Sequence, residues 1–376
     1  MHEAPNGRGA GTTAGCAVVA VLVVAAAAAL VSVLLGRPLP GGADQQGGTV
    51  AASETPLAKP RSKKPSGKRP GVVNIFTEQG LRGVGSAGTG IIIDPSGLVL
   101  TNNHVIQGAT TIRGTNTDTR RTYRAKVLGY QKSGDIALIQ LVGAADLIPA
   151  VLDDSGDTRK GDVVTAVGNA GGKGGDPEVV TGTITALDRD ITATDQSDGS
   201  SEKLSGLIET NAPIKPGDSG GPLLNTKGQV IGMNTAASAN YSMKQEGGPS
   251  PRGYSIPSRQ ALTIVRQIQR GDSSNGVHIG RTALLGVQVR TPTTQSGGEG
   301  NGAFITGLLR GTPAEQAGLR RRTTIVALDD QQVDSPGTLT DLLLQHQPGD
   351  TVQVIWTDAA GNRFRTAVTL GDGPPQ

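Results

Sequence analysis

Residues 215–223 read KPGDSGGPL, and this segment decides how the rest of the 376-residue chain is interpreted. Ser219 lies beside glycines that leave room for the backbone of a substrate. Gly217 permits a tight turn that directs its own N–H and that of Ser219 toward one point, where a tetrahedral oxyanion would form. The alternative is a glycine-rich hairpin loop with an incidental serine. The segment therefore predicts a candidate nucleophile, Ser219, and an oxyanion hole made by Gly217 and Ser219.

Upstream residues supply the partners that a serine nucleophile needs. Its hydroxyl is a poor nucleophile near neutral pH unless an adjacent base accepts the proton, and a buried carboxylate must fix the tautomer of that base. His104 lies in VLTNNHVI and is the one histidine in the β-rich region before Ser219, and Asp135 follows in SGDIALIQL. Taken alone, His104 reads as a surface histidine and Asp135 as a strand cap. In the order His, Asp, Ser they predict a catalytic triad.

From residue 72 onward, the chain alternates short β-branched runs with Gly, Asn, Asp and Pro. Examples are GTGIIID, GLVLTNN, ALIQLV, DVVTAVG, VVTGTITAL, QVIGMNT and GYSIP. Runs of this kind predict an all-β sandwich or barrel. A helix is expected at 258–270, with Ser258 as its cap. After the polar break GDSSNG at 271–276, a second unit contains the expected strands LLGVQV, GAFITGLL, TIVAL and TVQVIWT and the expected helices TPAEQAG and SPGTLTDLLLQHQ.

Composition limits the core and the functional class. Aromatic residues make up 2% and hydrophobic residues 35% of the chain, so Val, Ile, Leu and Ala must build the core. The single cysteine, Cys16, cannot form an intramolecular disulfide, and no cysteine cluster has metal-binding spacing. The basic excess is concentrated in residues 37–70, which leaves the other regions nearly neutral. A nucleic-acid-binding domain needs a basic face, so this class is excluded.

The N-terminal region predicts a membrane anchor. Residues 1–15 form a short tail, and residues 16–36, CAVVAVLVVAAAAALVSVLLG, carry no charge and are long enough to cross a bilayer as a helix. The alternative is a cleaved signal peptide, whose apolar core is shorter and precedes a small-residue cleavage site. Residues 37–70 are rich in Gly, Pro, Ala, Ser and Lys and predict a disordered basic linker. Its Lys/Arg run either contacts anionic head groups or is simply solvated.

The motifs resemble those of the HtrA (Deg) family of serine endopeptidases. TNNHVI, GDIALIQL and GDSGGPL match the three triad segments of that family, IETNAPIKPGDSGG resembles its approach to the nucleophile, and GYSIP its final protease strand. The resemblance implies an all-β, trypsin-like double β-barrel protease domain at 71–270. It also implies a linker at 271–280 and an α+β PDZ domain at 281–371.

The resemblance assigns roles to single residues. His104 would act as general base and then acid, Asp135 as its orienting carboxylate, and Ser219 as the nucleophile. Many members of the family carry Asn at the position of Asp218, whereas the Asp found here resembles the digestive trypsin-like enzymes. Since the N-terminus of this protein lies far away in sequence, activation through a freshly cleaved N-terminus is not expected.

The specificity pocket is expected to accept small or medium aliphatic P1 side chains. Pro213 lies six residues before Ser219, at a position where an enzyme that selects basic P1 residues would carry Asp. The strand QVIGMNTAAS instead supplies Ile231, Met233 and Asn234 to the predicted S1 pocket.

The second unit resembles a PDZ domain through LLGV, GAFITGLLRGTPAEQAGL and TIVALDDQQV. PDZ domains bind the C-terminus of a polypeptide by adding it as a strand to a sheet edge, with loop N–H groups that capture the carboxylate. By match, Leu285, Gly286 and Val287 fall at that loop and the strand behind it. Residues 320–324, RRRTT, depart from the usual Pro-Gly-Asp turn. The arginines either favour acidic peptides or form a basic loop that faces solvent.

The resulting hypothesis is a single-pass, membrane-tethered serine endopeptidase that degrades misfolded or unfolded envelope proteins on the extracytoplasmic side of the cell membrane. The alternative is a peptide-binding, chaperone-like protein with a dormant protease site. No cofactor or metal is expected, since GNAGGKGGD at 168–176 lacks the Ser or Thr that follows Lys in a phosphate-binding loop. The resemblance implies a homotrimer, for which VVNIF at 72–76 is the candidate interface.

Overall fold

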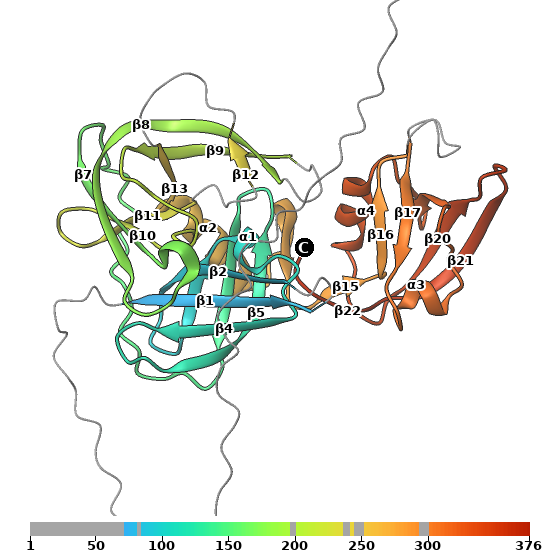
Figure 1. Cartoon of the computed structure of the whole chain (residues 1–376), viewed down its shortest axis with the longest axis horizontal. Helices are drawn as coiled ribbons and strands as arrows, with labels where there is room; N and C mark the ends of the chain where they lie inside the picture. Colours follow the sequence, from blue (N-terminus) through green and yellow to red (C-terminus); the bar gives the residue numbers. More distant parts are fainter. Residues whose placement is uncertain (1–70, 81–83, 196–200, 236–240, 244–251, 293–300) are drawn as a thin grey trace, which may run out of the picture. The chain divides into compact units, whose positions relative to one another are not determined.

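The computed structural model describes residues 71–80, 84–195, 201–235, 241–243, 252–292 and 301–376 (Figure 1). The N-terminal tail, the membrane helix and the basic linker predicted for residues 1–70 lie outside the described residues. Among the helices of the described ranges, none combines the length and the apolar character needed to cross a membrane.

The first β-barrel is a closed antiparallel ring. Its strands are β1 (Val72–Gln79), β2 (Val84–Ile92), β3 (Leu98–Thr101), β4 (Thr111–Asn116), β5 (Thr122–Gln131) and β6 (Ile136–Leu141). They follow the order β5-β4-β1-β2-β3-β6, and the ring closes because β5 also pairs with β6. A one-turn helix, α1 (Asn103–Ile106), follows β3 and carries His104.

The second β-barrel has the same ring topology. Its strands are β7 (Val163–Gly168), β8 (Glu178–Asp195), β9 (Ser201–Thr210), β10 (Pro222–Leu224), β11 (Val230–Asn234) and β13 (Gly253–Pro257). They follow the order β8-β7-β10-β11-β13-β9, with β8 paired to β9 to close the ring, and β12 (Tyr241–Met243) adds to β8. Between β7 and β8 lies the short 3-10 turn η1 (Ala170–Gly172). The all-β double barrel expected from the sequence is confirmed.

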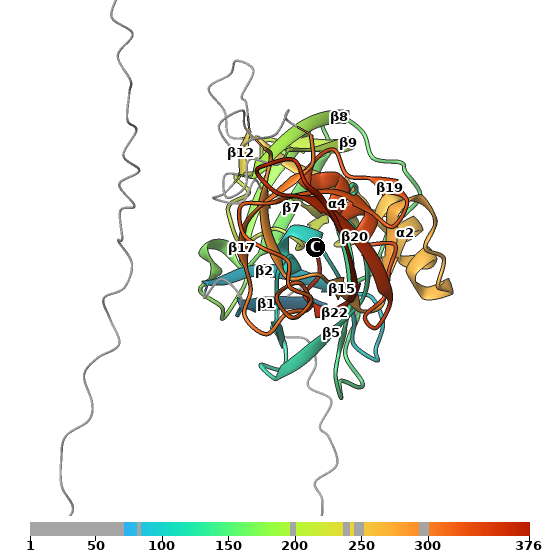
Figure 2. The same cartoon turned by 90° about the vertical axis from the view of Figure 1, so that its right-hand side faces the viewer.

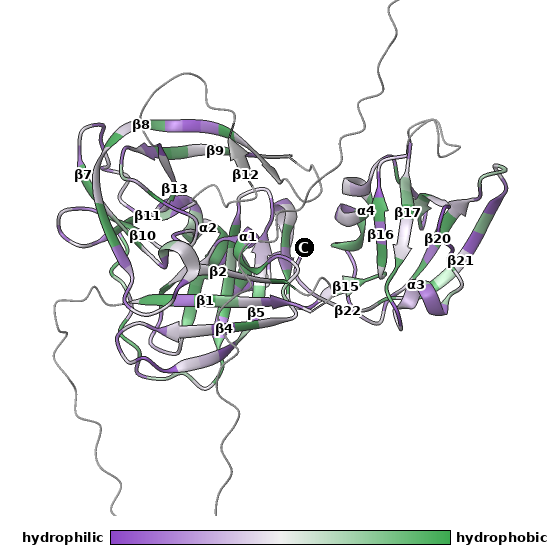
Figure 3. Cartoon of the chain, viewed as in Figure 1, coloured by the Kyte–Doolittle hydropathy of each residue, from purple (hydrophilic) through white to green (hydrophobic). Residues whose placement is uncertain are grey.

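Buried Val, Ile and Leu side chains fill both barrels, as the composition predicts. One core cluster includes Ile91 and Leu138 of the first barrel together with Val167 and Ile256 of the second. Figure 3 shows hydrophobic residues, in green, along the strands of both barrels. The two barrels therefore share a continuous core, which fixes the loops that both of them contribute to the candidate site.

Helix α2 (Ser258–Arg270) begins and ends where the sequence predicts it. Gly271 ends the helix in the left-handed region, with a φ of 70°, and its N–H donates to carbonyl oxygens of the last turn. The expected cap is wrong. Ser258 is the first helical residue, and its hydroxyl donates instead to the carbonyl oxygen of Val230 at 2.7 Å. Figure 2 shows α2, in gold, outside the barrel strands.

The segment 271–280 is more than the linker that the sequence predicts. It contains the 3-10 turn η2 (Ser274–Gly276) and the strand β14 (Val277–Ile279), which pairs with β5 of the first barrel. Val277 is buried in the same core cluster as the apolar face of α2. The sequence pattern missed β14 because three residues after a polar break give too short an alternation to recognise.

The C-terminal unit contains a six-stranded sheet. Five strands follow the order β16-β17-β18-β20-β21, and the sixth, β19, pairs with β18. A separate pair joins β15 to β22, so this unit extends two residues beyond the predicted boundary at residue 371. Its core is a distinct cluster that includes Leu285, Ile305 and Leu339. The elements are β15 (Thr282–Leu284), β16 (Val287–Arg290), β17 (Ala303–Leu308), α3 (Pro313–Gln316), β18 (Thr324–Leu328), β19 (Gln331–Gln332), α4 (Pro336–Leu343), β20 (Thr351–Thr357), β21 (Arg363–Thr369) and β22 (Gly371–Gly373).

The segment 72–76, VVNIF, is an interior strand of the first barrel. Val73 and Ile75 have no exposed surface, and Asn74 is 1% exposed. Phe76 is partly exposed. The apolar side chains that make this segment a candidate subunit interface are therefore mostly used in the barrel core, and the interface stays a prediction that depends on Phe76.

Candidate active site

His104 and Asp135 are in direct contact. Oδ1 of Asp135 accepts a hydrogen bond from the backbone N–H of His104 at 3.0 Å. The ring nitrogen Nδ1 of His104 lies 3.0 Å from Oδ1 and 2.9 Å from Oδ2 of the same carboxylate. Since an ionised carboxylate only accepts, Nδ1 carries the proton in this contact. That tautomer leaves Nε2 as the basic nitrogen of His104.

Two further residues hold Asp135 in place. Its backbone is left-handed, with a φ of 52°, a conformation that Asp adopts more readily than most residues. Asn102 donates from Nδ2 to the backbone oxygen of Asp135 at 3.0 Å, and the hydroxyl of Thr235 donates to Oδ2 at 3.0 Å. Motif reading missed Asn102 and Thr235, although Asn102 is part of TNNHVI and Thr235 is part of QVIGMNTAAS, the strand predicted to supply the S1 pocket.

Ser219 is connected to this network through the end of β11. The N–H of Gly220 donates to the carbonyl oxygen of Asn234 at 2.8 Å, and the N–H of Asn234 donates to the carbonyl oxygen of Gly221 at 2.8 Å. The next residue after Asn234 is Thr235, which bonds to Asp135. Ser219 itself is 3% exposed. The serine loop of the second barrel and the histidine–aspartate pair of the first are thus linked through a few hydrogen bonds.

The backbone before Ser219 has the geometry that an anion-binding turn requires. Gly217 has a φ of 99°, and a Cβ there would lie 2.2 Å from the carbonyl oxygen of Asn169, so only glycine fits. The carbonyl oxygen of Pro216 accepts a hydrogen bond from the N–H of Gly171 at 2.8 Å. Because a trans peptide directs its C=O and N–H to opposite sides, the N–H of Gly217 points away from Gly171.

Thr89 of β2 fixes the serine loop from the first barrel. Its N–H donates to the carbonyl oxygen of Ser219 at 2.8 Å, and its hydroxyl donates to the carbonyl oxygen of Gly217 at 2.7 Å. The same hydroxyl accepts from the N–H of Asn169 at 2.8 Å. Thr89 is fully buried, so these bonds are shielded from water. Sequence reasoning missed Thr89, because nothing in GTGIIID marks it as a partner of the distant loop.

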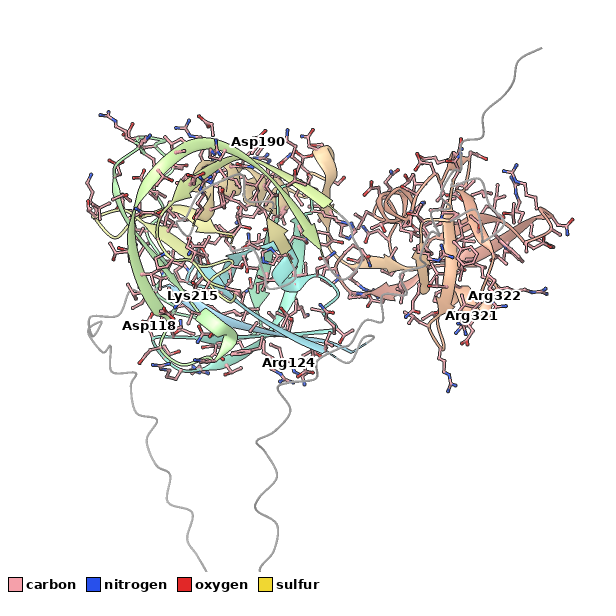
Figure 4. The ribbon with its side chains drawn as sticks, turned by 45° about the horizontal axis from the view of Figure 1, so that its top comes forward. Asp118, Arg124, Asp190, Lys215, Arg321 and Arg322 are labelled. Carbon is pink, nitrogen blue, oxygen red and sulfur yellow. The ribbon has the colours of Figure 1, made fainter. Side chains whose placement is uncertain are left out.

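Asp218 lies next to Ser219 in a different environment. Oδ2 of Asp218 accepts from the backbone N–H of Lys215 at 2.9 Å, whereas Oδ1 is buried and has no hydrogen-bond partner among the described residues. Burial raises the pKa of Asp218 to about 6. The Lys215 ammonium group, labelled in Figure 4, pairs instead with Glu178 at 2.6 Å.

The three residues predicted for the S1 pocket all lie on β11 and are buried. Ile231 is 7% exposed and Met233 is 1% exposed. The Asn234 side chain is used inside the barrel, where Nδ2 donates to the Pro222 carbonyl oxygen at 3.2 Å and Oδ1 accepts from the Ser255 hydroxyl at 3.1 Å. Asn234 therefore fixes the end of β11 next to the serine loop.

The predicted peptide-binding loop lies between β15 and β16. Leu285 is buried in the core of the C-terminal unit. Gly286 has a φ of 89°, and a Cβ there would lie 2.2 Å from the side chain of Thr312. Val287 begins β16, which is an edge strand of its sheet. The expected continuous strand LLGVQV is thus interrupted at Gly286.

Two family models match the protein. A trypsin-like peptidase domain matches residues 88–233, and a PDZ domain matches residues 283–357. The first range contains all three predicted triad residues and the second contains the predicted peptide-binding loop. Among the described residues, no group of three or more His, Cys, Asp or Glu side chains is arranged to hold a metal ion.

Several relatives are similar to more than two thirds of the chain. Serine protease PepD of Mycobacterium tuberculosis is 32% identical, over 95% of this chain and 77% of its own length. A probable periplasmic serine protease do/HhoA-like of Haemophilus influenzae is 35% identical, over 69% of this chain and 52% of its own length. The serine protease Do-like HtrA of Bacillus subtilis is 30% identical, over 71% of this chain and 60% of its own length. The chain thus spans about three quarters of the first relative and between half and two thirds of the other two.

Proposed function

The chain belongs to the HtrA family of serine proteases, and from this premise we propose that Ser219, His104 and Asp135 are its catalytic triad. The observation that carries the proposal is the contact of the Asp135 carboxylate with both Nδ1 of His104 and the hydroxyl of Thr235. It ties the histidine of one barrel to the strand that supports the serine loop of the other.

The proposed reaction is acyl transfer followed by hydrolysis. The Ser219 hydroxyl attacks the carbonyl carbon of the scissile peptide bond while His104 accepts its proton at Nε2. Asp135 stabilises the resulting imidazolium and keeps its orientation. His104 then donates the proton to the leaving amine, and a water molecule, deprotonated by His104, releases the acyl group from Ser219. These steps need no external oxidant, reductant or cofactor.

The proposed oxyanion hole is made by the N–H groups of Gly217 and Ser219. The orientation of the peptide between Pro216 and Gly217 supports it, because its carbonyl oxygen is held by Gly171. Backbone donors in a rigid turn stabilise the tetrahedral oxyanion without having to reorganise, and each is worth a few kcal/mol in the transition state. Thr89 supplies that rigidity from the first barrel.

Unfolded proteins are the proposed substrates, with small or medium aliphatic side chains at P1. Pro213, at the position where an enzyme that selects basic P1 residues would carry Asp, supports this preference. Ile231 and Met233 pack in the barrel core behind the serine loop, and Asn234 holds their strand beside Ser219. We further propose that the C-terminal unit binds the C-termini of peptides along β16. An edge strand presents unpaired backbone groups, and such an edge accepts an added peptide strand.

The loop before β18 contains three consecutive arginines, Arg320, Arg321 and Arg322. Figure 4 shows Arg321 and Arg322 projecting away from the ribbon. Arg321 donates from Nε to the carbonyl oxygen of Thr306 at 3.0 Å, while Arg322 has a left-handed backbone with a φ of 64°. Binding of peptides with acidic and with neutral residues upstream of the C-terminus distinguishes a recognition role from a solvated loop.

The proposed location is the extracytoplasmic side of a membrane, where the envelope proteins that unfold would be cleaved. The uncharged segment 16–36 supports a single-pass anchor, and the name of the Haemophilus influenzae relative places that protein in the periplasm. A homotrimer is proposed from family membership. Mass measurement of the purified protein in detergent tests the oligomeric state.

Cleavage of an unfolded model protein by the full chain and by its Ser219→Ala variant tests the proposed activity. We expect the variant to lose several orders of magnitude in kcat. The matched control is Ser96→Ala, which removes an exposed hydroxyl in the turn before β3 and should leave cleavage unchanged. Equal cleavage by parent and Ser219→Ala would overturn the proposal, and dominant cutting after Lys or Arg would overturn the P1 assignment.

A further inference from the structure

The last three residues, 374–376, are bound to the protease domain beside the helix that carries His104. The carbonyl oxygen of Pro375 accepts a hydrogen bond from the N–H of Gly108 at 2.7 Å. Nδ2 of Asn103 donates to the backbone oxygen of Gln376 at 3.0 Å, and the N–H of Gln376 donates to the hydroxyl of Tyr130 at 3.1 Å. Figure 1 marks this terminus with the letter C.

These contacts form an ordered binding site for residues 374–376. Pro375 is buried, and as a proline it brings no N–H that would be left unpaired. Every backbone hydrogen-bonding group of Pro375 and Gln376 has a partner on the protease domain. Two consecutive prolines also restrict the unbound segment, which lowers the entropy lost when it is ordered.

Tyr130 is the buried floor of this site. Its side chain is 1% exposed, and burial raises the pKa of its hydroxyl above the ordinary range. The hydroxyl stays protonated, so it can accept from Gln376 and donate to the Thr282 hydroxyl, which lies 3.2 Å away. Thr282 is the first residue of β15. Tyr130 therefore connects the C-terminal segment, the first barrel and the start of the C-terminal unit.

Helix α1 needs external support. It has only four residues and no side-chain hydrogen bond at its N-cap, and so short a helix is unstable on its own. Asn103 is its first residue, and Gly108 lies two positions beyond its last. The segment 374–376 bonds to both, on either side of His104 in sequence. The C-terminal segment thus braces the turn that positions the imidazole.

We propose that residues 374–376 are a positioning segment for His104, an inference that rests on the proposed catalytic role of that histidine. The segment keeps α1 in the orientation in which Nδ1 of His104 faces Asp135. It follows β22 directly, and β22 pairs with β15, which leads into the loop at Gly286. The C-terminal unit is therefore joined to the catalytic histidine by a continuous hydrogen-bonded segment, and peptide binding at that loop has a physical route to α1.

The test compares the full chain with a variant truncated after Gly373. We expect kcat/KM to fall about 10- to 100-fold, since small displacements of a catalytic group have effects of this size. The fall should lie in kcat, with KM retained, and the acid limb of the pH profile should shift because His104 is less well held by Asp135. The free peptide Gly-Asp-Gly-Pro-Pro-Gln should restore activity in trans. An unchanged kcat and pH profile would overturn the inference.

Two point variants test whether the loss comes from the missing contacts of the segment or from shortening the chain. Gln376→Ala is the matched control, because the contacts of Gln376 with the protease domain use its backbone. It should behave as the parent. Tyr130→Phe keeps the buried ring but removes the acceptor for the Gln376 N–H, so it should reproduce part of the loss. If Tyr130→Phe and Gln376→Ala both match the parent while the truncated protein unfolds, the segment is structural only and the inference is wrong.

Hydrogen exchange at Gly108 gives a readout that does not depend on activity. Its N–H donates to Pro375, so truncation should make this amide exchange at least about ten times faster, with no comparable change in the second barrel. Equal exchange of this amide in both proteins would contradict the proposed support of α1 by residues 374–376, even if the parent proved inactive. Conversely, a parent that shows the protected amide but is not affected by Ser219→Ala would overturn the proposed function and leave the contact itself established.

Discussion

Two buried aspartates beside the candidate site, Asp135 and Asp218, differ in what their carboxylates contact. Both are 3% exposed. The Asp135 carboxylate contacts the backbone N–H and ring Nδ1 of His104 and the hydroxyl of Thr235. The Asp218 carboxylate accepts from one backbone N–H, that of Lys215, and burial raises its pKa to about 6. Burial alone therefore does not decide what a carboxylate does; the number and direction of its donors do.

The largest expected effect follows from Asp135→Asn. An amide of the same shape keeps the geometry but can stabilise the wrong tautomer of His104 and cannot stabilise the imidazolium, so kcat should fall by about ten-thousand-fold at neutral pH. Steady-state cleavage of an aliphatic P1 peptide measures it. Asp218→Asn, the same chemical change one residue from the nucleophile, is the control. Similar losses in the two variants would remove the distinction between the aspartates.

Thr235→Val should have an intermediate effect. It removes one donor to the Asp135 carboxylate while preserving the shape of the side chain, and a hydrogen bond to a charged group is worth about 1.5 to 3 kcal/mol. We expect kcat/KM to fall about tenfold or more, with recovery in Thr235→Ser, which restores the hydroxyl. A Thr235→Val enzyme as active as the parent would show that His104 alone holds the carboxylate.

Asp218→Asn should stabilise the protein at pH 7. The pKa of Asp218 is about 6 in the folded protein, higher than its ordinary value of 3.8. Ionisation of Asp218 therefore opposes folding, with its full effect at pH values above about 6. The gain should be on the order of 1 to 2 kcal/mol, allowing for screening by solvent. As pH falls from about 6 to about 4, the parent takes up the proton and gains stability, and the advantage of the variant should vanish. Denaturant unfolding at several pH values measures it, and a pH-independent difference would show that ionisation of the buried carboxylate is not the cause.

The smallest effect should come from Lys215→Met. The Lys215 side chain forms an exposed ion pair with Glu178, and exposed pairs contribute little to stability. The bond that matters to Asp218 comes from the backbone of Lys215, which the substitution keeps. We expect an unchanged melting temperature. A clear loss of stability would mean that the ammonium group compensates the charge of Asp218 directly.

Local patterns predicted those parts of the fold that depend on local sequence. The range of α2, the ends of β18 and β20 and the all-β character of the protease domain are confirmed. Two of the missed elements are short and paired over long distances, whereas the missed strand β21 has seven residues and pairs with its neighbour β20. The three-residue strands β14 and β22 take their structure from β5 and β15, which are far away in the sequence. A three-residue segment carries too little alternation to indicate a strand by itself.

The residues of the candidate site also fall into two groups, those that local sequence could suggest and those whose roles depend on distant contacts. His104, Asp135 and Ser219 each lie in a recognisable motif, so the sequence could suggest them. Thr89 and Thr235 are common residues whose roles exist only because folding places them against partners about a hundred positions away. Neither charge nor spacing marks them, and they became visible once the hydrogen bonds between the barrels were known.

The most direct measurement of the central claim is to identify the residue that a fluorophosphonate modifies in the full-length protein at neutral pH. We expect a single adduct on Ser219, found by peptide mass mapping, and slow or absent labelling in the Asp135→Asn variant with normal labelling in Asp218→Asn. An adduct on another serine, or labelling of Ser219 at the same rate in all three proteins, would contradict the proposed triad.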